Sequence, residues 1–194
     1  MKSLLTIVFF GLISTISAFS YSQVNRTIDP VVTTALLKYA YPYEKRFQSS
    51  YESAQWISSM NYRLRRFVPN GSMRISILLT VIQEARKHNL PPELILSIME
   101  VESRFKSSVT SHAGAEGIMQ IMPFWKKSIG TTSDNLFDVK TNIQYGCAIL
   151  SQYLKREKGN HTRALGRYNG SLGKTWYAER VYAAFHKNWE PTNK

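Results

Sequence analysis

Apolar side chains recur at helical spacing through residues 72–90, SMRISILLTVIQEARKHNL. One face of this segment carries the three- and four-residue repeat of an amphipathic helix, formed by Ile75, Leu78, Leu79, Ile82 and Ala85. Asn89 and the pair Pro91 and Pro92 predict where this helix ends, and Pro92 suits the first turn of a following helix. The pattern therefore predicts two consecutive helices.

Three later segments also predict helices. Residues 135–157 have their apolar positions in helical register, with Asp138 or Thr141 as the expected cap, and these positions are Ile143, Cys147, Leu150 and Leu154. Residues 161–173 predict a short helix that runs into a glycine-rich turn, and residues 175–189 predict an aromatic helix. No stretch alternates convincingly with the two-residue period of a strand, so the predicted fold class is mainly α.

The helix predicted from PPELILSIMEVESRF, residues 91–105, carries a carboxylate among its apolar positions. A step of about 100° per residue places Glu102 near the middle of the arc formed by Leu94, Ile95, Ile98, Met99 and Phe105. The opposite side collects Glu93, Ser97, Glu100 and Arg104. We expect that side to be solvated, with Glu100 free to pair with Arg104, and we expect Glu102 to face inward.

An inward-facing glutamate at position 102 has two interpretations. A buried ionised carboxylate is costly without a partner, so Glu102 could be part of a structural salt bridge or could cap a neighbouring loop. Alternatively, burial raises its pKa and makes it a general acid that stays protonated near neutral pH. Its place near the C-terminal end of the helix favours the edge of a cleft, where the helix dipole also raises the pKa.

The first 20 residues, MKSLLTIVFFGLISTISAFS, have the layout of a secretory signal peptide. Lys2 precedes an apolar run that is short for a membrane span, and Ala18-Phe19-Ser20 resembles a cleavage site. We therefore predict cleavage near residue 20 rather than a stable membrane anchor, and a periplasmic or secreted protein. Residues 21–71 then form a predicted N-terminal helical extension, and residues 72–194 form the main domain.

The formal net charge of +12 favours an acidic partner, such as anionic lipid, nucleic acid or a carboxylate-bearing cell-wall polymer. No nucleic-acid-binding motif accompanies the charge, so we predict no nucleic-acid partner. Cys147 is the single cysteine, and its apolar surroundings predict a small buried residue rather than a reactive thiol. The four histidines show no metal-ligand spacing, so we predict no metal site.

The segment SHAGAEGIMQIMP, residues 111–123, has the composition of a binding loop. Ser111 offers a hydroxyl group and Gln120 offers an amide, both of which suit sugar hydroxyls and N-acetyl groups. Most of its methionines and isoleucines predict core contacts, with Met122 as the exception. Tyr168 and Asn169 combine an aromatic face with a polar tip. Two structural explanations stay open: residues 111–123 could be a loop that leads to a buried helix, and Tyr168 and Asn169 could belong to a simple turn.

An ordered series of motifs resembles the soluble lytic transglycosylases, whose SLT domain has a lysozyme-like fold. It covers about half of the chain and comprises Glu102-Ser103-x-Phe105, Ser111-x-x-Gly114-Ala115-x-Gly117-Ile118-Met119-Gln120-x-x-Pro123, Asn135-Leu136-Phe137-Asp138, Asn142-Ile143-x-x-Gly146 and Ala164-Leu165-x-x-Tyr168-Asn169-Gly170. Each motif is weak alone, and their combination in this order is specific. Gly173 or Lys174 stands where the late motif of the family usually begins with Glu-Thr, and Ser107 stands where a proline is common.

The resemblance implies a goose-type or SLT lysozyme-like catalytic domain over residues 72–194 that acts on the glycan strands of peptidoglycan. It implies that Glu102 is the sole catalytic acid and base, and that a glycan groove is lined by Ser111, Gln120, Met122, Tyr168, Asn169 and, less securely, Tyr177. It also implies that no cofactor is needed. Glu116 occupies a variable position of its motif, so we expect it to be exposed rather than a second catalytic carboxylate.

With a single acid, the expected reaction is non-hydrolytic: the C6 hydroxyl of the sugar closes onto C1 and leaves a 1,6-anhydro end. Hydrolytic glycosidases generally need two carboxylates. Two alternatives stay open, a goose-type lysozyme-like hydrolase and a non-catalytic peptidoglycan-binding or secretion-assembly protein. An envelope-spanning machine is a possible further partner.

Overall fold

The computed structural model describes residues 50–191, and the predicted leader and most of the predicted extension lie outside that range. The described elements are α3 (Ser50–Leu64), α4 (Gly71–His88), α5 (Pro92–Ser103), the 3₁₀ turn η3 (Pro123–Trp125), α6 (Lys126–Ile129), α7 (Val139–Arg156), α8 (His161–Asn169), α9 (Trp176–Ala184) and the π-helical turn η4 (Phe185–Trp189). Within residues 50–191 there is no strand, only two isolated antiparallel bridges, Thr110 with Glu116 and Glu116 with Ile121. The predicted mainly α fold is confirmed.

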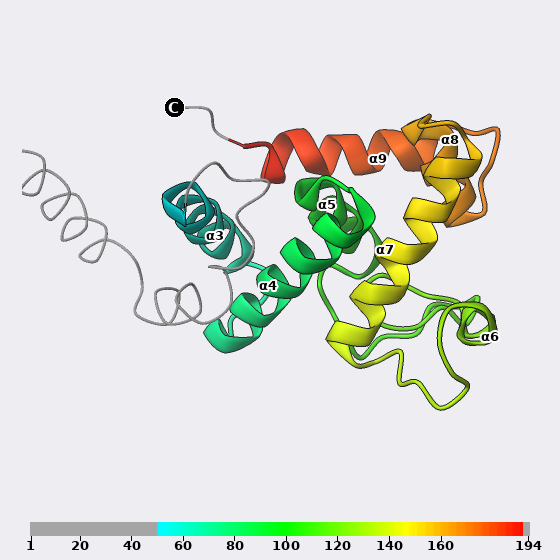
Figure 1. Ribbon diagram of the computed structural model, residues 1–194, viewed down its shortest axis with the longest axis horizontal. Coiled ribbons are helices and arrows are strands. Elements are labelled where there is room, and N and C mark those ends of the chain that lie inside the picture. The colour runs from blue at the N-terminus through cyan, green and yellow to red at the C-terminus, as the bar shows by residue number, and fades with distance from the viewer. Residues whose placement is uncertain (1–49, 192–194) are drawn as a thin grey trace, which may run out of the picture.

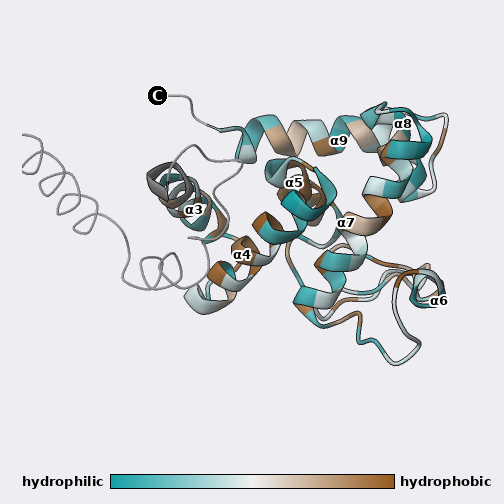
Figure 2. Cartoon of the chain, in the orientation of Figure 1, coloured by the Kyte–Doolittle hydropathy of each residue, from teal (hydrophilic) through white to brown (hydrophobic). Residues whose placement is uncertain are grey.

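Helix α5 lies in the middle of the molecule, with α4, α9 and η4 packed against it (Figure 1). α3 packs on α4 and η4, and α7 packs on α4 and α8. Hydrophobic stretches on α4, α5 and α7 lie beside hydrophilic ones, as expected for amphipathic helices (Figure 2). Among the helices of residues 50–191, none is both long enough and apolar enough to cross a bilayer.

The prediction of a solvated face on α5 is wrong for Glu93 and Ser97, because residues 92–99 are all buried, whereas Arg104 is exposed. Glu93 is 5% exposed and accepts a 2.7 Å hydrogen bond from Nε1 of Trp56 in α3. The fully buried Ser97 donates to the carbonyl oxygen of Glu93 at 2.7 Å. A helical-wheel projection of α5 alone cannot show that α3 and η4 cover the face that carries Glu93, Ser97 and Glu100.

Glu100 differs from its prediction for the same reason. Glu100 is only partly exposed. Its carboxylate accepts a 2.7 Å hydrogen bond from Nδ2 of Asn188 and another of 2.7 Å from Nε1 of Trp189. Arg104 is the left-handed residue, φ 52°, at which α5 ends. Glu100 therefore anchors the C-terminal turn η4 to α5 rather than serving as a solvated partner of Arg104.

The predicted helix ends are confirmed where a local signal specified them. Asn89 ends α4 in the left-handed conformation, with φ 53°, and Pro92 begins α5. Of the two candidate caps of α7, Asp138 is the N-cap, and its side chain accepts from the backbone N–H of Thr141.

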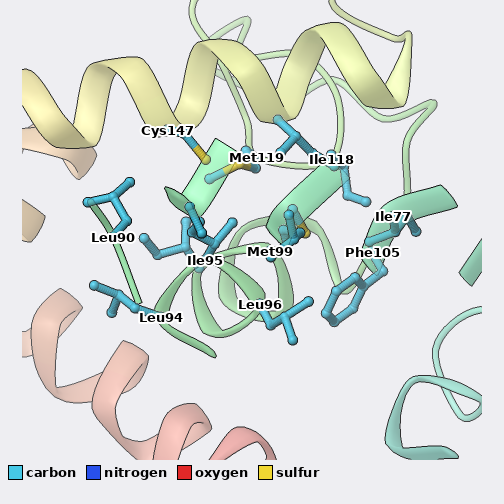
Figure 3. Close-up of a cluster of buried hydrophobic side chains, with 14 of the residues drawn as sticks. Ile77, Leu90, Leu94, Ile95, Leu96, Met99, Phe105, Ile118, Met119 and Cys147 are labelled. Carbon is cyan, nitrogen blue, oxygen red and sulfur yellow. The ribbon is translucent and has the colours of Figure 1, made fainter. Parts of the chain in front are cut away.

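The segment between α5 and α6 contributes buried side chains to the core. Ile118 and Met119 lie between α7, which carries Cys147, and α5, which carries Ile95 and Met99 (Figure 3). A Cβ on Gly146 of α7 would collide with the Met119 side chain, so glycine permits this close approach. Cys147 is fully buried, as predicted, and burial raises the pKa of its thiol.

The described part of the predicted extension shares this core. Trp56, Ile57, Met60 and Leu64 of α3 are buried in the same hydrophobic cluster as the side chains of α4 and α5. The predicted boundary after residue 71 falls at the first residue of α4, and α3 on the other side of it packs against α4.

Candidate active site

Glu102 lies one residue before the end of α5, where α9 crosses the helix. Its carboxylate oxygen Oε1 accepts a 2.5 Å hydrogen bond from the hydroxyl group of Tyr177 in α9. Tyr177 is 1% exposed, so its ring is held by the core and its hydroxyl position is well defined. The packing of α5 on α9 thus supplies Glu102 with a fixed neutral donor.

Burial raises the pKa of Glu102 to about 7, against an ordinary value of 4.5. The hydrogen bond from Tyr177 and the positive charge of Arg180 act in the opposite direction and lower this pKa. Desolvation disfavours the charged carboxylate more than these two neighbours stabilise it. The carboxyl group can therefore hold a proton near neutral pH and also release it.

Arg180 is a neighbour of Glu102 that the sequence analysis missed. It is exposed and follows Tyr177 by three residues in α9, so the two side chains share one side of that helix. The three-residue spacing is a usable signal once Tyr177 is known to contact Glu102. Nothing in the sequence alone indicates that contact.

Tyr168 of α8 is a second tyrosine whose pKa is affected by the charge of Glu102. Its hydroxyl group donates a 2.9 Å hydrogen bond to the carbonyl oxygen of Met119. Burial, followed by the nearby charge of Glu102, raises the pKa of Tyr168, and the same two causes raise the pKa of Tyr177. Both phenols therefore stay protonated and act as hydrogen-bond donors at physiological pH.

Ser103, the residue after Glu102, ties α5 to the segment that follows. Its hydroxyl group donates to the carbonyl oxygen of Ile118 at 2.7 Å, and the residue is 9% exposed. The segment that contains Ile118 also contains Met119, whose carbonyl oxygen accepts the hydrogen bond from Tyr168. Ser103 therefore links the end of the helix that carries Glu102 to the backbone that holds Tyr168.

Two predicted binding residues form hydrogen bonds with the backbone of residues 109–117, within the segment between α5 and η3. The Gln120 amide nitrogen donates to the carbonyl oxygens of Gly117 at 2.8 Å and Val109 at 3.3 Å. The Ser111 hydroxyl oxygen accepts from the backbone N–H of Ala115 at 2.9 Å. Part of the hydrogen-bonding capacity of both side chains is therefore used within the protein.

Asn142 of α7 is the internal support of this segment. It is fully buried: its Nδ2 donates to the carbonyl oxygens of Glu116 at 2.8 Å and Leu136 at 2.6 Å, and its Oδ1 accepts from the Met119 backbone N–H at 2.7 Å. Gly117, with φ 78°, packs directly on this amide, and an added Cβ would collide with it and with the Leu136 carbonyl oxygen. One asparagine of α7 thus connects residues 116–119 with the backbone at Leu136, just before the same helix.

Three further residues of the predicted motifs lie at or near the ends of other elements. Met122 is partly buried and immediately precedes η3, and Asn169 is the exposed last residue of α8. Glu116 is partly buried, and its backbone forms both isolated bridges. Within residues 50–191, no group of three or more His, Cys, Asp or Glu side chains is arranged to hold a metal ion.

Comparison with protein-family models identifies the chain. Residues 80–189 match the model described as "Transglycosylase SLT domain", which is more than half of the chain. The chain belongs to the SLT transglycosylase family. Within this SLT domain lie Glu102, Tyr168, Tyr177 and the Asn142 support described above.

Curated relatives of this SLT domain include the "Transglycosylase" of Enterobacteria phage PRD1, 34% identical over 52% of this chain and 37% of that protein. The "Membrane-bound lytic murein transglycosylase C" of Salmonella paratyphi B is 35% identical over 48% of this chain and 30% of that protein. The chain thus spans about a third of the length of the curated relatives it matches.

Among solved structures, an inactive mutant of lytic transglycosylase Slt from Pseudomonas aeruginosa is 21% identical to this chain, with a TM-score of 0.46. The match covers 81% of this chain and 34% of that one.

Proposed function

We propose that this protein is a lytic transglycosylase that cleaves the β-1,4 bond between N-acetylmuramic acid and N-acetylglucosamine in peptidoglycan without water, leaving 1,6-anhydro ends. The observation that carries the proposal is the partly buried Glu102 carboxyl group, whose desolvation raises its pKa to about 7 and which accepts a hydrogen bond from Tyr177, inside an SLT domain. The similarity to a phage transglycosylase and to a lytic murein transglycosylase supports the same reaction.

Glu102 acts twice in the proposed reaction. In the first step its protonated carboxyl group gives the proton to the glycosidic oxygen, and the bond from that oxygen to C1 of the muramic acid breaks. In the second step the carboxylate takes the proton of the C6 hydroxyl group while that oxygen bonds to C1. A pKa near neutral serves both steps, because the group must be a good acid and then a competent base.

Tyr177 is a positioning residue in this proposal. Its buried ring and short hydrogen bond hold one carboxyl oxygen, so that the other oxygen is left for the substrate. Because Tyr177 stays protonated, it stabilises the carboxylate formed after the first step. This limits the cost of ionising a buried group during the reaction.

We assign the glycan contacts to Ser111, Gln120, Met122, Tyr168 and Asn169. The amide nitrogen of Gln120 is held by backbone carbonyl groups, which leaves its carbonyl oxygen to accept from an N-acetyl N–H or a sugar hydroxyl. The net charge of +12 suits a polymer whose stem peptides carry carboxylates. Peptidoglycan lies outside the cytoplasmic membrane, so the proposal also requires export to the periplasm, for which the predicted leader at residues 1–20 would serve.

The deciding experiment is a digestion of purified sacculi followed by mass spectrometry of the released muropeptides. The proposal expects anhydro products, which are lighter than reducing-end products by one water. A goose-type lysozyme-like hydrolase would give reducing ends and would incorporate label from ¹⁸O-water. Intact sacculi after incubation with the folded protein would favour a non-catalytic wall-binding role.

A further inference from the structure

A pocket of about 650 Å³ opens between the C-terminal end of α3 and the turn η4. Four permanently charged side chains line it: Arg63, Arg65, Arg66 and Lys187. Tyr62 also lines it and is 71% exposed, which provides an accessible aromatic wall. The charges come from two segments far apart in the sequence, so only the packing of η4 against α3 brings them together.

The charges of this pocket are not neutralised by carboxylates. Arg63 donates to the backbone carbonyl oxygens of Asn188 at 3.1 Å and Glu190 at 2.8 Å, which fixes the guanidinium group without cancelling its charge. The Arg65 guanidinium carbon lies 5.6 Å from the centre of the Tyr62 ring. Within residues 50–191, none of the four cations forms an ion pair with an acidic side chain.

A smaller pocket of about 260 Å³ continues the first, because Arg66, Lys187 and Asn188 line both. It adds Arg104 at the end of α5, and the guanidinium carbons of Arg66 and Arg104 lie 4.6 Å and 5.9 Å from the centre of the Phe67 ring. We call the two together the basic pocket. Five permanent cations line it, against the carboxylates of Glu100 and Glu190.

The basic pocket is separate from the candidate active site. Glu100 lines it, whereas Glu102 does not, and two residues along a helix correspond to a rotation of about 200°. None of the residues assigned above to acid catalysis or glycan contact lines it. A ligand in the basic pocket therefore leaves Glu102 free to act on another part of the same polymer.

We infer that the basic pocket binds the carboxylate-bearing stem peptides of peptidoglycan, as a second attachment to the wall that rests on the function proposed above. Guanidinium groups bind carboxylates through paired N–H donors. Glu100 already accepts from Asn188 and Trp189, whereas the exposed Glu190, 3.2 Å from Nδ1 of His186, suits a ligand that also carries an amine, as a peptide does. A polyphosphate chain or an anionic bilayer would gain nothing from a carboxylate in the pocket and would favour an open, uniformly positive surface.

The two-site arrangement has a consequence on an insoluble polymer. Each stem peptide held in the basic pocket raises the effective concentration of neighbouring glycan bonds at Glu102, without any new contact to the reacting sugar. The pocket therefore increases attachment to intact sacculi and has no effect on attachment to glycan that lacks peptides.

The test compares binding of two charge-reversal variants to sacculi by co-sedimentation. Arg66→Glu with Lys187→Glu reverses two exposed cations of the basic pocket, and Lys155→Glu with Arg156→Glu makes the same charge change in the last turn of α7. Both pairs are made in a Glu102→Gln background so that the wall stays intact during the measurement. We expect the pocket variant to bind about tenfold more weakly than the α7 variant, and both to unfold at similar temperatures.

Two further substrates identify the ligand. Sacculi stripped of peptides by an amidase keep the lactyl carboxylates of the glycan, so they should bind the pocket variant and the charge-matched α7 variant equally. Binding to phosphatidylglycerol vesicles and to a single-stranded oligonucleotide should fall by the same factor in both variants, as expected from net charge alone. Equal sacculus binding of the two variants, or a loss confined to vesicles or to the oligonucleotide, would overturn the inference.

The outcome is separable from the proposed activity. Digestion by the protein with Glu102 intact tests the activity, and sedimentation tests the pocket. If the wall is cleaved to anhydro products but the pocket variant binds normally, only the inference about the basic pocket fails. If the pocket variant loses binding but the unaltered protein releases no muropeptides, only the proposed reaction fails.

Discussion

The hydroxyl group of Tyr177 donates a 2.5 Å hydrogen bond to Oε1 of Glu102, although the two residues are 75 positions apart in the sequence. The bond stabilises the ionised carboxylate, whereas burial of the same group stabilises the protonated form. The balance of the two leaves the pKa near 7. The pair therefore determines at which pH the proposed acid is ready to act.

Replacing Glu102 by glutamine should reduce cleavage of sacculi by at least about a hundredfold, because the amide can neither donate nor accept the required proton. Release of soluble muropeptides measures the loss. Glu116→Gln is the matched control, since Glu116 is the other glutamate within the matched motifs and is not assigned a role in proton transfer. Loss of activity in the control would indicate a second catalytic carboxylate and a hydrolytic mechanism.

The pH profile of cleavage should fall as the pH rises through about 7, because Glu102 loses the proton that it must donate. Tyr177→Phe removes a hydrogen bond that lowers this pKa, so the alkaline limb of the profile should move to higher pH. Rates measured from pH 5 to 9 give the shift. Tyr182→Phe, a partly buried tyrosine on the same helix, should leave the limb in place. A downward shift in Tyr177→Phe would contradict the assigned role of the hydrogen bond.

Glu102→Gln should also stabilise the folded protein at high pH. The folded pKa of about 7 exceeds the ordinary value of 4.5, so the native state holds more protons than the unfolded state between these values. The contribution of Glu102 to stability is thus lost as the pH rises from about 4.5 to 7. Above pH 7 the glutamine variant should gain up to about 3 kcal/mol in its free energy of unfolding, and it should gain little at pH 4.

Urea unfolding of both proteins at pH 4 and pH 8 measures this difference. A stabilisation that is equal at the two values would show that it does not come from ionisation of Glu102. The expected combination, lower activity with higher stability, is typical of a group kept in a costly environment for its function.

Gly117→Ala should destabilise the protein by about 3 kcal/mol, because the residue has φ 78° and the new Cβ would collide with the Asn142 amide and the Leu136 carbonyl oxygen. Gly114→Ala is the matched control: it has φ 86° but no atom within 4 Å of an added Cβ. The control should lose only about 1 kcal/mol from backbone strain. Thermal or urea unfolding distinguishes the two, and equal losses would show that the contact with Asn142 carries no energy of its own.

The sequence by itself determined the features that depend on neighbouring residues. Periodicity and caps located α4, α5 and α7, because the ends of a helix are chosen by local backbone geometry, as Asn89 and Asp138 illustrate. The same periodicity placed Glu102 inside an apolar arc, and burial does raise its pKa. The ordered motifs indicated the SLT family, and the match of residues 80–189 to the SLT domain model shows that the chain belongs to it.

Only the tertiary structure decided which elements meet. The wheel drawn for α5 predicted one solvated face, whereas α3 and η4 cover it and give Glu93 and Glu100 buried partners. The bond from Tyr177 to Glu102, the position of Arg180 and the contacts of Asn142 with Glu116 and Met119 each join segments far apart in the chain. Such contacts follow from how whole helices pack, and no spacing within a single helix carries that information.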